Sequence, residues 1–418
     1  IWHYPASLEM KPAGPRPTAR MDSLSFYLGD TAWELFHRLD REQADRYLRN
    51  RAEKGFTVIQ AVAVAELDGH RDPNPYGHVP FVDMDPARPA IQDGGENDYW
   101  DHVDYIVARA NELGLVIGLL PTWGRYWNES IVDDRPLFDK RNAEVYGEWL
   151  GRRYRDSRVI WVMGGDRRPD DEPKRNVIRA MARGLRRGDG GEHLITFHPA
   201  GGQGSAQFFH EEDWLDFNSM QTWADVQLIC PMVTHDYNLR PVKPVLMAEG
   251  AYEAGSEYGF EVSPLWVRRQ AYYSYLAGAH HTYGHNDSWR VLPTWREALD
   301  APGAVQMGIL KRFFMARPEW WLMVPDQSIL ASGGRTDGRL LHLAARHRDG
   351  RWAVVYLSEP TSFSVNLDRL AGSAVSAVWV NPETGDASPA GSLRASGTQP
   401  FSSPDHWADA LLVLDGEA

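Results

Sequence analysis

Two acidic residues stand where apolar, strand-like runs end. Asp166 follows the run 159–165, and Glu249 follows the run 244–248. A carboxylate at the end of a buried strand is costly unless it is hydrated, paired or used in function. Glycoside hydrolysis uses such a pair: one acid protonates the leaving oxygen, and the other attacks the sugar or activates water. The alternative is structural, with Asp166 capping the next turn and Glu249 paired with an arginine such as Arg290.

The elements that must position these acids alternate between strand and helix. Strand patterns cover residues 24–28, 56–64, 115–120, 159–163, 193–197, 217–220, 245–248 and 279–283. Helical patterns cover residues 40–54, 97–113, 140–154, 171–185, 264–276 and 304–316. Alternation of this kind indicates an α/β protein with a parallel sheet. Eight strand–helix units in about 300 residues predict a (β/α)8 TIM barrel.

The pattern changes after Pro318. Short strands with intervening turns are predicted at 340–344, 352–357, 362–367, 375–380 and 410–414, which is typical of a small antiparallel β-sandwich. Residues 1–20 are rich in proline and are predicted to form an arm. The expected organisation is therefore an arm at 1–20, a catalytic barrel at 21–320 and an accessory β-sandwich at 321–418.

In a TIM barrel, the working residues lie at the carboxyl ends of the strands. Most of the predicted strand ends carry polar or aromatic side chains, with Glu66, Trp223 and Trp289 a little further along. We expect the following to hold sugar hydroxyls or to stack on a sugar ring: Asp30, Trp33, Gln60, Trp123, His198, Gln221, Tyr252, His281 and His285. For each of them, a packing role at the barrel mouth is the alternative.

Composition excludes several classes of function. The chain of 418 residues has a net charge of −13 and no long basic run, which argues against a nucleic-acid partner. No apolar run is long enough to span a membrane, and the start lacks the order of a signal peptide. Cys230 is the single cysteine. These features favour a cytoplasmic protein, and they do not indicate an oligomeric state.

No cofactor or metal is expected. Gly164-Gly165 and Gly201-Gly202 lack the Lys-Ser/Thr that follows in a phosphate-binding loop. His281 and His285 have a spacing that suits zinc on a helix, but the segment has the pattern of a strand and a turn. Two alternatives to a hydrolase with two carboxylates stay open. One is a barrel that binds sugar without cutting it, and the other is a metal-dependent hydrolase in which His70, His78 or His235 joins these histidines.

Several motifs together resemble the apiosidase-like glycoside hydrolases, family 140 and its relatives. They are Gly29-Asp30-Thr31-Ala32-Trp33-Glu34-Leu35-Phe36, Gly55-Phe56-Thr57-Val58-Ile59-Gln60, Trp161-Val162-Met163-Gly164-Gly165-Asp166, Glu249-Gly250-Ala251-Tyr252-Glu253 and Tyr283-Gly284-His285-Asn286. The likeness covers about residues 24–320. The tail resembles a β-sandwich that is often attached to these barrels and is named a collagen-binding domain.

The resemblance implies a retaining hydrolase with Asp166 as acid/base and Glu249 as nucleophile, and we expect exo-action if the loops at 66–96 and 126–135 cover the barrel mouth. It favours a pentofuranoside such as apiose as the substrate. Related barrels commonly carry Asn-Glu where this chain has Gly165-Asp166, so a shorter acid must reach the sugar. We expect Asp166 to be protonated at first, with its pKa raised by burial and by the negative charge of Glu249. If Glu249 is not the nucleophile, the nearby Glu253 is the next candidate.

Overall fold

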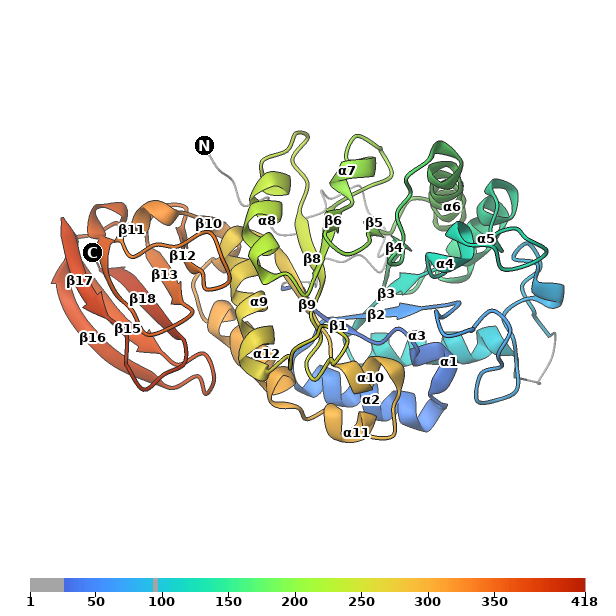
Figure 1. The fold of residues 1–418 in the computed structure, drawn as a ribbon, viewed down its shortest axis with the longest axis horizontal. Helices are drawn as coiled ribbons and strands as arrows, with labels where there is room; N and C mark the ends of the chain where they lie inside the picture. The colour runs from blue at the N-terminus through green and yellow to red at the C-terminus, as the bar shows by residue number, and fades with distance from the viewer. Residues whose placement is uncertain (1–25, 93–96, 418) are drawn as a thin grey trace.

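The computed structural model describes residues 26–92 and 97–417, which form a barrel followed by a β-sandwich (Figure 1). The barrel sheet has the order β5-β4-β3-β2-β1-β9-β8-β7-β6, and the paired neighbours are parallel except for β6 and β7. Its strands are β1 (Leu28–Thr31), β2 (Val58–Val62), β3 (Val116–Leu120), β4 (Val159–Gly164), β5 (Ile195–His198), β6 (Gln203–Gly204), β7 (Asn218–Trp223), β8 (Val245–Gly250) and β9 (His280–Tyr283). The predicted TIM-barrel class is confirmed.

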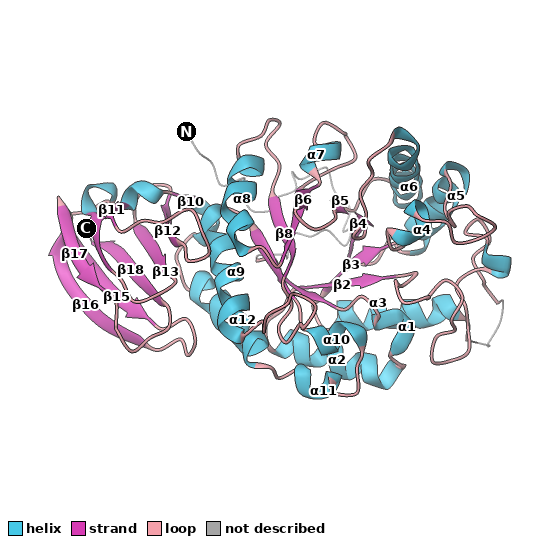
Figure 2. Cartoon of the chain, in the orientation of Figure 1, coloured by secondary structure: helices cyan, strands magenta, loops and turns pink. Residues whose placement is uncertain are grey.

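Helices alternate with these strands around the barrel (Figure 2). They are α1 (Leu35–Arg38), α2 (Arg41–Glu53), α3 (Tyr99–Glu112), α4 (Arg125–Asn128), α5 (Lys140–Arg153), α6 (Glu172–Asp189), α7 (Ala206–Phe209), α8 (Ile229–Tyr237), α9 (Pro264–Ala277), α10 (Asn286–Arg290), α11 (Trp295–Ala298) and α12 (Pro302–Met315). The six predicted helices are α2, α3, α5, α6, α9 and α12. Asp40 caps α2 as expected, because its carboxylate accepts from the backbone N–H of Gln43.

The first strand differs from its prediction. Among the described residues it covers Leu28–Thr31, and Phe26 packs in an aromatic cluster against Tyr275 and Trp320. Residues 24 and 25 of the predicted range 24–28 lie outside the described residues. The strand itself continues into the polar pair Asp30 and Thr31, which an apolar pattern does not detect. The predicted arm at 1–20 lies outside the described residues.

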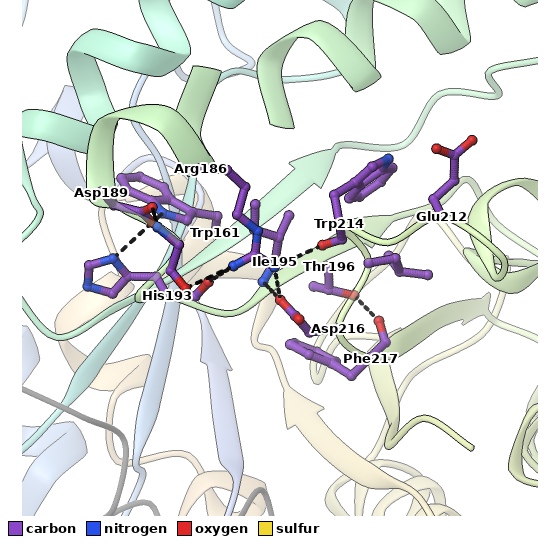
Figure 3. A network of polar contacts seen from close by, with 12 residues as sticks. Trp161, Arg186, Asp189, His193, Ile195, Thr196, Glu212, Trp214, Asp216 and Phe217 are labelled. Atoms are coloured by element: carbon purple, nitrogen blue, oxygen red, sulfur yellow. Dashed lines mark hydrogen bonds and ion pairs between the residues drawn. The ribbon is translucent and has the colours of Figure 1, made fainter. Parts of the chain in front are cut away.

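The barrel closes between β5 and β7 largely through side chains (Figure 3). The Thr196 hydroxyl donates to the Phe217 carbonyl at 2.7 Å, and the Asp216 carboxylate accepts from the Ile195 N–H at 2.7 Å. Arg186 of α6 donates to the same carboxylate at 2.5 Å. These bonds stand in for strand-to-strand bonds, so β5 and β7 are held side by side without a full ladder.

The C-terminal part consists mainly of strands in two antiparallel sheets (Figure 2). The sheet orders are β10-β12-β13-β18-β15-β16 and β11-β14-β17. The strands are β10 (Met323–Pro325), β11 (Leu330–Ser332), β12 (His342–His347), β13 (Trp352–Leu357), β14 (Ser362–Asn366), β15 (Ala374–Val380), β16 (Ala387–Arg394), β17 (Thr398–Ser402) and β18 (Ala410–Glu417). The prediction omitted β10 and β11, which have three residues each, and also β16 and β17, which are mostly exposed and lack an apolar pattern.

The barrel and the sandwich share one apolar core. Tyr272 of α9 stacks on Tyr356 of β13 with ring centroids 4.7 Å apart. Beside this stack, Arg268 donates two hydrogen bonds to Asp409, at 2.9 and 2.6 Å, and both side chains are buried. The sandwich is therefore fixed to the outer face of α9. None of the described helices is long and apolar enough to cross a membrane.

Candidate active site

Asp166 is placed by a backbone turn that requires glycine. β4 ends in three successive residues with positive φ: 93° at Gly164, 105° at Gly165 and 52° at Asp166. A Cβ at Gly165 would lie 2.8 Å from the Gly124 nitrogen and 2.8 Å from the Trp123 ring. The two glycines let the end of β4 pack against the Trp123-Gly124 turn, and this turn presents Asp166 at the rim of the barrel.

The two predicted catalytic acids meet there, with His198 between them. His198 ends β5, and its Nδ1 lies 3.7 Å from Asp166 Oδ1. Its Nε2 lies 3.2 Å from Glu249 Oε2. One oxygen of each acid and a ring nitrogen all lie within 4.8 Å of one another. Asp166 keeps 31% of its side chain exposed, whereas Glu249 keeps 5%, so the former faces the open pocket more directly.

Neighbouring side chains orient Glu249. Gln221 of β7 donates to Glu249 Oε1 at 2.6 Å. The Tyr252 hydroxyl accepts from Trp33 Nε1 at 2.9 Å, and Tyr252 lines the pocket together with Glu249. The hydrogen bond from Gln221 holds the carboxylate against rotation, which a nucleophile needs.

The surroundings shift the proton affinities of the site. Burial, together with the charge of Glu249, raises the pKa of Asp166 to about 8. Burial alone would lower the pKa of His198, but the close approach of Glu249 and the charges of both acids outweigh burial and raise that pKa. Asp166 is thus suited to hold a proton near neutral pH, as an acid catalyst must.

A pocket of about 450 Å³ opens above the acids. Its lining residues are Trp33, Glu66, Leu67, Asp166, Trp223, Glu249, Tyr252, Glu257, Tyr258, Trp289 and Arg290. Of the residues selected from the sequence, the lining includes Asp166, Glu249, Trp33 and Tyr252. The lining also includes Glu66, Trp223 and Trp289, which the sequence places a little beyond predicted strand ends. Tyr258 and Glu257 lie on the loop after β8 and carried no signal in the sequence.

The other residues selected from the sequence lie behind or below this pocket. Asp30 is fully buried and pairs with Arg51 at 2.6 Å. Gln60 donates to the Thr282 hydroxyl at 2.8 Å, and Trp123 packs on Trp33. His198 and Gln221 contact the acids from behind, as described above. His281 lies 3.2 Å from the Ser274 hydroxyl, and His285 caps α10.

Two further alternatives are decided by geometry. Arg290 pairs with Glu257 at 3.4 Å, so it is not the partner of Glu249. Glu253 accepts from the Tyr283 hydroxyl at 2.5 Å and from the Gly303 N–H at 3.1 Å, within a buried network outside the pocket lining. Glu253 is therefore engaged elsewhere and is not placed to attack a sugar in this pocket.

The histidine cluster considered for a metal does not assemble. Within residues 26–92 and 97–417, the one group of His, Cys, Asp and Glu side chains close enough to hold an ion is Asp166, His198 and Glu249. Oxygen and nitrogen donors of this kind would accept a divalent cation. The same three residues also satisfy the needs of a two-carboxylate hydrolase, and a chelator distinguishes the two uses.

Comparison with known proteins agrees with this geometry. Residues 19–321 match the family model "Apiosidase-like, catalytic domain", and residues 324–415 match "Putative collagen-binding domain of a collagenase". A search among curated proteins found no match.

Two solved structures are similar over nearly the whole chain. One is described as a glycoside hydrolase, with 28% identity, a TM-score of 0.83 and coverage of 94% of this chain and 93% of that one. The other is a glycoside hydrolase family 5 protein from Bacteroides vulgatus, with 28% identity, a TM-score of 0.83 and coverage of 94% and 89%. The chain therefore belongs to the apiosidase-like family and is a glycoside hydrolase with a C-terminal β-sandwich.

Proposed function

We propose that this glycoside hydrolase is a retaining, exo-acting enzyme with Glu249 as nucleophile and Asp166 as acid/base. The observation that supports this most is the approach of the two acids within 4.8 Å across the barrel rim. Retaining enzymes hold their carboxyl groups about 5–5.5 Å apart, whereas inverting enzymes leave about 6.5–9.5 Å for a water molecule. The close approach of one oxygen of each acid supports the retaining arrangement.

In the first step, protonated Asp166 gives its proton to the leaving oxygen while Glu249 attacks the anomeric carbon. The glycosidic bond breaks, and an ester forms between the sugar and Glu249. The negative charge has then moved from Glu249 to Asp166. Loss of the charge on Glu249 removes one cause of the raised pKa of Asp166, so Asp166 becomes a base that takes a proton from water. Water attacks the anomeric carbon, and the ester bond breaks.

The pocket lining favours a small, neutral glycoside. A volume of about 450 Å³ lies at the small end of ligand pockets and suits the end of a chain or a short glycoside. Asp166, Glu249, Glu66 and Glu257 bring four carboxyl groups to the lining against the single Arg290, which already pairs with Glu257. An anionic sugar would be repelled there. The family match supports a pentofuranoside such as apiose.

The test is hydrolysis of nitrophenyl pentofuranosides and hexosides, with the anomer of the first product read by proton NMR. Retention of configuration supports the proposal, and inversion contradicts it. Glu249→Gln should abolish release with the fold intact. Asp166→Asn should lose more activity on poor leaving groups than on nitrophenolate, which needs little protonation. Unchanged Glu249→Gln activity would place the nucleophile elsewhere.

A metal-dependent reaction is the second candidate, because Asp166, His198 and Glu249 could also hold an ion. The same assay with and without a chelator separates the two. Full activity after chelation and dialysis supports the two-carboxylate reaction. Loss of activity, with recovery on adding a divalent cation, supports the metal-dependent one.

A further inference from the structure

His198 occupies a position that sugar binding does not explain. The side chain is fully buried and is absent from the pocket lining. Its ring is held edge-on to Trp33, with centroids 5.3 Å apart, and lies 6.0 Å from Trp123. A side chain that is enclosed by two indoles and hidden from the pocket does not reach the hydroxyls of a bound sugar.

Both nitrogens of the His198 ring instead face the acids. Nδ1 lies 3.7 Å from Asp166, and Nε2 lies 3.2 Å from Glu249. The acids come from β4 and β8, on either side of the barrel, while His198 comes from β5. Other ionisable groups near the acids are Glu66, whose charge acts on Asp166, and Tyr252, which lies near the charge of Glu249. Neither has an interaction with His198 comparable to those of the two acids.

We propose that His198 is a positioning residue that bridges the two catalytic carboxyls and donates an N–H to whichever one is ionised. This inference rests on the retaining mechanism proposed above, in which the negative charge leaves Glu249 and appears on Asp166. A protonated imidazole has one N–H on each side, so a small shift of Asp166 toward Nδ1, from 3.7 Å to hydrogen-bond distance, lets the ring serve both states without turning over. Its positive charge offsets the moving negative charge throughout the cycle.

The raised pKa of His198 is consistent with this role, because a buried histidine without anionic partners would lose its proton more easily. The bridge also explains how two acids approach within 4.8 Å without forcing each other apart. The imidazole fixes their separation from behind, while the sugar occupies the pocket in front.

A measurement that needs no activity tests the bridge first. The imidazole of His198 is followed by NMR in histidine-labelled protein, and its signal is assigned by its absence in His198→Phe. Glu249→Gln should lower the titration midpoint of His198, because it removes the ionised partner; adding Asp166→Asn in that background, where Asp166 has become the ionised acid, should lower the midpoint by about one further pH unit. If adding Asp166→Asn to Glu249→Gln does not move the midpoint, His198 serves Glu249 alone and the bridge is refuted, whether or not the protein cleaves a glycoside.

Kinetics then test the consequence for catalysis. His198→Phe keeps a ring between the two indoles but removes both nitrogens, and we expect kcat to fall about 100-fold with KM changed less than about threefold. His198→Gln, which restores one N–H, should recover part of kcat and shift the pH profile. His102→Phe is the control, since His102 is fully buried and bonds the Leu39 carbonyl away from the site.

Two results would overturn the role. A rise in KM with unchanged kcat in His198→Phe would make His198 a binding residue. A loss of kcat in His198→Phe no larger than in His102→Phe would show that His198 only fills space. If the wild type shows no hydrolysis at all, the proposed reaction fails, while the NMR result still decides whether the bridge exists.

Discussion

Replacing Gly165 by alanine tests whether the turn after β4 sets the position of Asp166. Gly165 has a φ of 105°, and an added Cβ would lie 2.8 Å from the Gly124 nitrogen and from the Trp123 ring. Contacts under 3 Å with backbone and with a buried ring cannot be relieved by moving a flexible side chain. The end of β4 must therefore shift, or the strain must remain in the folded protein.

Two costs set the expected loss of stability in Gly165→Ala, the left-handed backbone conformation and the overpacking by the added Cβ. A left-handed conformation costs a residue with a Cβ about 1–2 kcal/mol, and overpacking of a core costs about 1–3 kcal/mol. Gly165→Ala should thus lose about 2–5 kcal/mol of stability if the turn keeps its shape. If the turn relaxes, Asp166 moves with it, and a displacement of about 1 Å can cost about 100-fold in rate.

The assay combines thermal unfolding with hydrolysis of aryl glycosides that differ in leaving group. We expect a lower melting temperature, a lower kcat, or both, with the larger loss of kcat on poor leaving groups that need the proton of Asp166. Gly77→Ala is the matched control, because Gly77 has a φ of 85° but no atom within 4 Å of an added Cβ. It should show the conformational cost alone and normal kinetics.

The reasoning is refuted if Gly165→Ala matches Gly77→Ala in melting temperature and matches the wild type on both classes of leaving group. Such a result would show that the close approach of Gly165 to Gly124 and Trp123 is not needed to place the acid.

Three other predictions concern the proton of Asp166, the exposed ring of Trp223 and the buried pair Arg268–Asp409. Burial raises the pKa of Asp166 above its unfolded value, so the wild type loses stability as pH rises toward about 8. Asp166→Asn lacks this titration and should melt at a higher temperature than the wild type. The difference in melting temperature should grow from pH 5 to pH 9. An equal margin at both pH values would contradict this. Trp223 is 47% exposed at the pocket with a φ of 53°, and its ring lies 5.2 Å from the ring of Tyr258. If Trp223 stacks on a sugar aglycone, Trp223→Ala should raise KM up to about tenfold for glycosides with such an aglycone, and Trp223→Phe should raise it less. Equal KM values would exclude stacking there. Arg268→Met should cost about 3–5 kcal/mol in denaturant unfolding because it leaves Asp409 buried and unpaired, and adding Asp409→Leu should recover much of that loss. If the losses in free energy of unfolding from Arg268→Met and Asp409→Leu simply add in the double variant, the two side chains do not stabilise the protein as a pair.

The sequence by itself determined the architecture and selected the two acids that we propose as the catalytic pair. Apolar runs long enough for buried strands alternated with amphipathic helices, and that order leaves few topologies besides a barrel. Since parallel strands bring their carboxyl ends to one rim, acids at two strand ends could be expected to lie at the same mouth. Asp166 and Glu249 were found in this way.

Only the tertiary structure decided which other side chains reach the pocket. Asp30 and Gln60 also lie at strand ends, but their side chains are buried below the rim and bond to Arg51 and Thr282. Glu66 and Tyr258 reach the pocket from loops. The bridging position of His198 depends on the glycine turn that aims Asp166 and on the packing of β5 beside β4. Such positions depend on contacts between segments far apart in the chain, and local sequence patterns do not encode them.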